Sequence, residues 1–179
     1  MPRRVFVDTE WTAPPWSDQC ELMWIGLADE DGGSWCAISA DADIDPSSND
    51  FISGVWKYIS PDDPSMTTSE ITAGVREFCG DVDEFWAWIP PLERFARFFG
   101  LGEEAPRVFA KYRDWDLQVV RSLIDPWPGS WPDRLNDLNT AAVEAGVEIP
   151  PPPANLLAPD VHAIWNRDLF ALIRQAQQG

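Results

Sequence analysis

The sequence has few of the residues that mark secreted, membrane-spanning or zinc-binding proteins. Its 179 residues include three cysteines and one histidine, and no Cys-x-x-Cys pair occurs. An odd number of widely spaced cysteines is unlike a disulfide scaffold or a zinc knuckle, and it favours a reducing compartment. The apolar run near the start, residues 5–7, is far too short for a signal peptide or a membrane span. We therefore expect a cytoplasmic protein that makes no use of a membrane.

Positive charge is also scarce. Thirteen Lys and Arg stand against thirty Asp and Glu, which gives a formal net charge of −17. Nucleic-acid binders usually neutralise phosphates with Lys and Arg, so this balance argues against an ordinary one. Two routes remain open to an acidic protein: divalent cations reverse the local field of a carboxylate cluster, and aromatic faces stack on bases. Eleven tryptophans keep the second route open, although most are expected in the core.

What remains is the composition of one folded domain. The hydrophobic share of 45% is too high for a disordered acidic tail, and the length suits a single domain over residues 1–179. Apolar patterning predicts strands at residues 3–7, 21–28, 34–39 and 107–112, and it leaves residues 85–88 ambiguous between a strand and a helical turn. A Gly-containing turn at residues 29–33 predicts a hairpin between the second and third strands.

Helices are expected where an apolar stripe follows a start signal. Thr67-x-x-Glu70 is a capping box that opens one helix, which Gly80 ends. The other expected helices begin at Pro90, after Asp116, at Pro132 and near Pro159. Three strands in succession, then helices around one more strand, predict an α/β domain with a mixed sheet.

Asp8 and Glu10 follow the first apolar run and are two residues apart. On a strand they lie on the same face, where two unpaired carboxylates would be costly to bury. A cation between them removes that cost, and carboxylate oxygens suit Mg²⁺ or Mn²⁺. An Asp-x-Glu pair occurs often by chance, and a solvated strand edge is the alternative interpretation.

The pair gains meaning from two later segments. Asp116 is expected to follow a strand and to open a helix, while His162 begins the last helix with Asp168 six positions on. This order resembles the DEDDh 3′–5′ exonucleases, and most of all their small single-domain branch, the polyadenylate-specific exoribonucleases of mycobacteria and their phage relatives. The segments that resemble the three family motifs are residues 5–10, 109–116 and 160–162.

The resemblance implies a ribonuclease H-like fold, with the second strand antiparallel in a mixed sheet flanked by helices. It also implies a hydrolase that removes nucleotides from the 3′ end of single-stranded RNA or DNA, with a homodimer as one arrangement. Two Mg²⁺ or Mn²⁺ ions would be held by Asp8, Glu10, Asp116 and Asp168, with His162 as the general base. Thr9 and Trp11, which lie beside the acids, would contact the substrate.

Two departures from the family pattern leave alternatives open. The family places the last Asp five residues after the His, where this chain has Arg167. We expect Arg167 to face solvent and Asp168 to reach the cleft through a small bulge, with Asn166 as the weaker substitute. Glu93, after residues 85–88, is the alternative to Asp116. The altered motif and the negative charge also allow a binding or decoy protein that has lost catalysis on the same fold.

Overall fold

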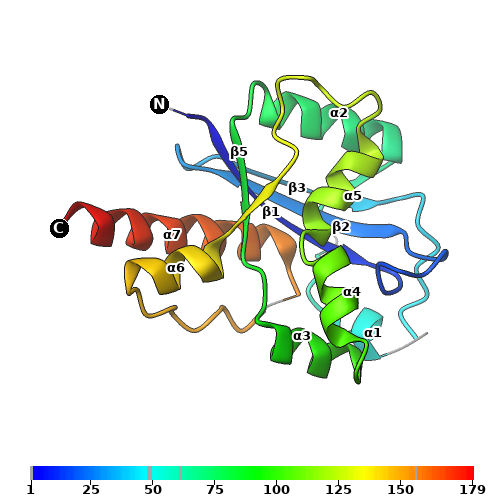
Figure 1. Cartoon of the computed structure of the whole chain (residues 1–179). Helices are drawn as coiled ribbons and strands as arrows, with labels where there is room; N and C mark the ends of the chain where they lie inside the picture. Colours follow the sequence, from blue (N-terminus) through cyan, green and yellow to red (C-terminus); the bar gives the residue numbers. More distant parts are fainter. Residues whose placement is uncertain (1, 48–49, 61, 156) are drawn as a thin grey trace.

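The computed structural model describes residues 2–47, 50–60, 62–155 and 157–179. In this part of the chain, six strands form one mixed sheet in the order β4-β3-β2-β1-β5-β6, with helices packed on both of its faces (Figure 1). The α/β class predicted from the sequence is confirmed, and the architecture is compatible with a ribonuclease H-like fold. None of the described helices is long and apolar enough to cross a membrane.

The strands are β1 (Arg4–Trp11), β2 (Leu22–Asp29), β3 (Ser34–Ser39), β4 (Ser65–Met66), β5 (Glu84–Ala87) and β6 (Leu135–Asp137). The described helices are α1 (Asp50–Trp56), α2 (Thr68–Cys79), α3 (Leu92–Phe99), α4 (Ala105–Tyr112), α5 (Trp115–Leu123), α6 (Leu138–Ala145) and α7 (Pro159–Gln178).

The first three strands form an antiparallel meander. β2 runs antiparallel to both β1 and β3, and the expected reversal of the second strand is confirmed. The other pairs, β1 with β5, β5 with β6 and β3 with β4, are parallel. β1 therefore lies between an antiparallel and a parallel neighbour, well inside the sheet.

The alternation of side chains along β1 divides the core into two layers. Val5 and Val7 pack on one face with the apolar stripes of α2 and α5. Phe6 points to the other face and packs with α6 and α7. Figure 1 shows the same division, with α2 and α5 on one side of the sheet and α6 and α7 on the other. The same alternation continues along β1 to Glu10, and the register with β2 shifts between Glu10 and Trp11.

The expected strand at residues 107–112 is wrong, because this segment lies in helix α4. Its buried and half-buried positions are Ala105, Val108, Phe109 and Tyr112, which have the spacing of one helical face rather than the alternation of a strand. The parallel strand beside β1 is instead β5, which settles the ambiguity at residues 85–88. The segment before Asp116 is therefore a helix followed by a short turn.

The helix expected over residues 132–145 begins later. Residues 135–137 form strand β6, and the side chain of Asp137 caps α6 by accepting a hydrogen bond from the Asn139 backbone N–H. Asp is a preferred N-cap residue, and its capping bond fixes this boundary. The capping box at Thr67 and the stop at Gly80 are confirmed for α2. Helix α1 and strand β4 were not foreseen.

Candidate active site

Strand β1 carries Asp8 and Glu10 within the sheet rather than beyond its end, because the strand continues to Trp11. Asp8 follows the alternation of Phe6 and points toward α7. There its Oδ1 lies 2.7 Å from Nδ1 of His162, in the first turns of that helix. The first and last segments of the site, 154 residues apart in sequence, thus meet through one hydrogen bond.

Asp116 reaches the same strand from the opposite face of the sheet. It lies in the first turn of α5, and its Oδ1 accepts hydrogen bonds from the Thr9 backbone N–H at 3.0 Å and the Thr9 hydroxyl at 2.7 Å. Thr9 was expected to contact the substrate. It lines the same pocket as Asp8 and Asp116, and both of its donors bind Asp116 and hold that carboxylate against β1.

Two carboxylates of this cluster, those of Glu10 and Asp116, have a raised pKa. Burial raises the pKa of Glu10 well above its ordinary value, and the charges of Asp8 and Asp116 raise it further. Burial and the charge of Asp8 raise the pKa of Asp116 to about 7, although the hydrogen bonds from Thr9 and the nearby His162 act against the shift. Burial and the charge of neighbouring carboxylates therefore disfavour the ionised forms of Glu10 and Asp116.

His162 is packed between two indole rings. Trp165 stacks on it with ring centroids 5.3 Å apart and an interplanar angle of 18°, and Trp88 approaches at 6.3 Å in an edge geometry. Burial alone would lower the pKa of His162, but the charge and hydrogen bond of Asp8, with Asp116, raise it above its usual value. Nδ1 is occupied by Asp8, while Nε2 is buried without a hydrogen-bond partner in the described residues.

A pocket of about 240 Å³ is lined by Asp8, Glu10, Asp116 and His162, and its other walls are mainly aromatic. Trp11 lies in the wall, stacked on Phe99 at 5.7 Å with an angle of 16°. The pocket lining from outside the acid cluster includes Phe51, Trp88, Arg94, Phe95, Phe98, Tyr112, Arg113 and Trp115. Helix α3, for which the sequence predicted a start at Pro90 but no part in the pocket wall, thus supplies one wall of the pocket. The sequence feature that could have indicated this wall is the clustering of Phe95, Phe98 and Phe99 within five residues.

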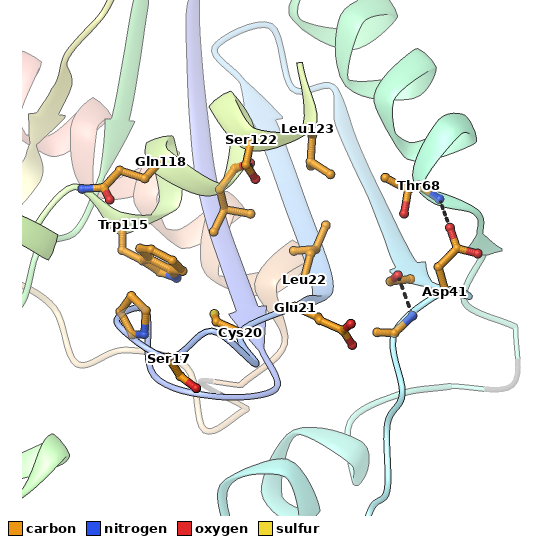
Figure 2. Close-up of a pocket in the computed structure, with 14 residues that line it drawn as sticks. Ser17, Cys20, Glu21, Leu22, Asp41, Thr68, Trp115, Gln118, Ser122 and Leu123 are labelled. Carbon is orange, nitrogen blue, oxygen red and sulfur yellow. Dashed lines mark hydrogen bonds between the residues drawn. The ribbon is translucent and has the colours of Figure 1, made fainter. Parts of the chain in front are cut away.

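Figure 2 shows a second, larger pocket of about 540 Å³, bordered at one edge by Trp115. Gln118 and Ser122 of α5 line it on one side, and Asp41 lies on the other, where it accepts a hydrogen bond from the Thr68 backbone N–H. None of the residues of the acid cluster belongs to this lining. The larger of these two pockets is therefore not the one that contains the acid cluster.

The expectation that Asp168 reaches the cleft is wrong. Its side chain is 62% exposed and binds the guanidinium of Arg167, with 2.8 Å between Nη2 and Oδ1. Helix α7 continues without a bulge, so a residue six positions after His162 points about 120° away from it. Asn166 takes the inward position: it is fully buried, and its Nδ2 donates to the Val7 carbonyl at 3.3 Å. Glu93, the alternative acid, is exposed on α3 and does not line the pocket.

The fit of the site to a divalent cation rests on the chemistry of its donors. Asp8 uses only Oδ1 for His162, and its Oδ2 is buried with no hydrogen-bond partner among the described residues. Yet no set of three or more His, Cys, Asp or Glu side chains in the described ranges is arranged to hold a metal ion. Carboxylate oxygens are nevertheless the donors that a hard cation such as Mg²⁺ prefers. To hold such an ion, the carboxylates of Asp8, Glu10 and Asp116 must turn toward a common point.

No protein-family model matches this sequence, and no curated protein matches it at a significant level.

Proposed function

We propose that this protein is a divalent-metal-dependent 3′–5′ exonuclease that acts on single-stranded RNA or DNA. The observation that carries the proposal is the convergence of Asp8 and Glu10, Asp116 and His162, from β1, α5 and α7, on one aromatic-walled pocket. Carboxylates that burial and mutual repulsion keep from ionising are typical of functional sites. The aromatic rings suit nucleobases, which stack without any need for positive charge.

In this proposal, Asp8, Glu10 and Asp116 hold Mg²⁺ or Mn²⁺. When bound, the two ions would activate a water molecule and neutralise charge on the phosphate that is attacked. Neutralisation of the acids by the cations also weakens the repulsion between the substrate and a protein of charge −17.

His162 is assigned as the general base. The hydrogen bond between Nδ1 and Asp8 selects the tautomer in which Nδ1 carries the proton, which leaves Nε2 as the acceptor. Trp165 and Trp88 restrict the imidazole from two sides. The ring is thus oriented before the substrate arrives, and an oriented base is what general-base catalysis requires.

The direct test uses 5′-labelled single-stranded RNA and DNA oligonucleotides with the purified protein. We expect shortening from the 3′ end that depends on Mn²⁺ or Mg²⁺ and stops with EDTA. A 3′-phosphorylated oligonucleotide should resist this shortening, because the terminal hydroxyl is blocked. Products that are insensitive to EDTA, or cleavage that starts inside the strand, would contradict the proposal.

A second candidate function is a nucleic-acid-binding protein without catalysis on the same fold. The outward position of Asp168 and the amide of Asn166, where a fourth acid was expected, favour it. The two candidates differ in one measurement: the binding protein retains a labelled oligonucleotide uncut in the presence of Mn²⁺, whereas the nuclease shortens it.

A further inference from the structure

The charges around the pocket are unevenly paired. Two arginines line it, Arg94 in α3 and Arg113 at the end of α4. Arg113 is engaged with Asp137 at 3.1 Å. Arg94 makes no side-chain hydrogen bond or ion pair with the residues that the structure describes, although three carboxylates line the same pocket. An unpaired guanidinium is thus present at the site in a strongly acidic protein.

Arg94 is held in place by an aromatic ring rather than by a carboxylate. Its Cζ lies 4.7 Å from the ring centroid of Trp88, the indole that approaches His162 edge-on. This cation–π contact uses the positive charge of the guanidinium but occupies none of its N–H donors with a hydrogen-bond acceptor. Arg94 is an exposed residue in the lining of the pocket that also contains His162, and its hydrogen-bonding capacity is unused within the described residues.

We propose that Arg94 is a substrate-positioning residue that binds a phosphodiester of the nucleic-acid strand through its N–H fork. The inference rests on the proposed function and extends it to the recognition of the backbone. A planar fork of donors matches two non-bridging phosphate oxygens, which a lysine in this position would not do. In this arrangement the aromatic rings contact the bases and the acid cluster holds the cations. Arg94 fixes the position of the nucleic-acid backbone along the pocket.

The test measures binding separately from hydrolysis. A 5′-fluorescein-labelled single-stranded oligonucleotide is titrated with protein by anisotropy, with Ca²⁺ in place of Mg²⁺. We expect Arg94→Gln to weaken binding about tenfold, the loss typical of one charge-assisted hydrogen-bonded contact. It should also reduce the salt slope by about 0.7, the value for one phosphate on a single strand. Arg97→Gln, one turn further along α3 and outside the pocket lining, is the matched control and should change affinity less than about twofold.

Single neutral methylphosphonate linkages, placed one at a time from the 3′ end, identify the contact. At one linkage the wild-type protein should lose about tenfold in affinity, while Arg94→Gln should lose nothing further. Equal losses for Arg94→Gln and Arg97→Gln, or no linkage that removes the difference from wild type, would overturn the inference. The coupling that the assignment of Arg94 requires is one methylphosphonate linkage that weakens binding by wild type but not by Arg94→Gln. If this coupling is found but Mn²⁺ yields no cleavage, the nuclease proposal fails while the assignment of Arg94 stands. Cleavage without coupling gives the reverse result.

Discussion

Gly26 of β2 and Pro159 of α7 are in such close contact that a Cβ added to Gly26 would overlap the backbone carbonyl of Pro159. Gly26 is also the residue that faces Asp8 across the β1–β2 pair. The missing side chain thus lets the start of α7 settle on the sheet, three residues before His162. The approach of His162 to Asp8 depends on this contact.

We expect Gly26→Ala to destabilise the protein by about 3 kcal/mol, because the overlapping group is backbone and cannot rotate away. Gly129→Ala is the control, since a Cβ there meets no atom within 4 Å. Thermal or urea unfolding measures both variants. An unchanged midpoint for Gly26→Ala would show that α7 shifts without cost.

The two aspartates that were expected to bind metal should differ sharply in their effect on activity. Asp116→Asn removes a charge from the enclosed cluster, so we expect kcat to fall by at least about 100-fold. Asp168→Asn alters an exposed side chain bound to its neighbour Arg167, so we expect a change of no more than about twofold. The rate of oligonucleotide shortening with Mn²⁺ compares them. Comparable losses for both variants would place Asp168 in the reaction.

Trp11 offers its ring to the pocket from the strand that carries the acids. Base stacking on an aromatic side chain contributes about 1–3 kcal/mol, so Trp11→Ala should raise KM about tenfold with a smaller change in kcat. Trp56→Ala, at an exposed tryptophan outside the pocket lining, is the matched control. Melting curves check that both variants fold. A fall in kcat with KM unchanged would contradict a role for Trp11 in stacking.

Without divalent cations, thermal stability should fall as the pH rises from about 5 to 8. The pKa of Asp116 is raised to about 7, and that of Glu10 is raised as well. A carboxyl with a higher pKa in the folded than in the unfolded state holds its proton more tightly when folded, so its contribution is lost as pH climbs through the folded pKa. The raised pKa of His162 acts in the same direction.

Melting temperatures in EDTA across this range measure the trend. Asp116→Asn should flatten it, because the titrating carboxyl is gone while the side-chain volume is kept. A melting temperature that rises from pH 5 to 8 would contradict the assigned shifts.

Mn²⁺ should stabilise the protein most at alkaline pH. Protons compete with the cation for Glu10 and Asp116, so binding strengthens as those carboxyls ionise. At about 100 times its Kd, an ion that binds only the folded state adds about 2.7 kcal/mol to the free energy of unfolding. Melting curves with and without Mn²⁺ at pH 5.5 and 8 compare the gain. An equal gain for wild type and Asp116→Asn would place the ion elsewhere.

The parts of the site that the sequence predicted share one property: local spacing determines them. Asp8 and Glu10 were predictable because alternation on a strand puts them on one face, and the helix that starts at Pro159 brings His162 near its beginning. The prediction for Asp168 was wrong because of its angular position around helix α7 relative to His162. Four residues after His162, Asn166 is rotated by only about 40°, whereas Asp168 is turned well away.

Other features depend on tertiary contacts that local patterns do not encode. The segment at residues 107–112 is apolar and aromatic enough for a strand, but it packs one helical face against the rest of the fold. The role of Thr9 follows from the approach of α5 across the sheet, and that of Arg94 from the position of Trp88. Each of these depends on which elements become neighbours after folding.

The 154-residue separation of Asp8 and His162 also bears on how the protein matures. During synthesis, β1 and its carboxylates precede by 154 residues the imidazole that orients on Asp8, which belongs to α7. A nascent chain that stops before residue 159 has the acids without the imidazole of His162, and Gly26 of β2 lacks the contact with Pro159. The pair of Asp8 and His162 can therefore form only after the chain has been made through the start of α7.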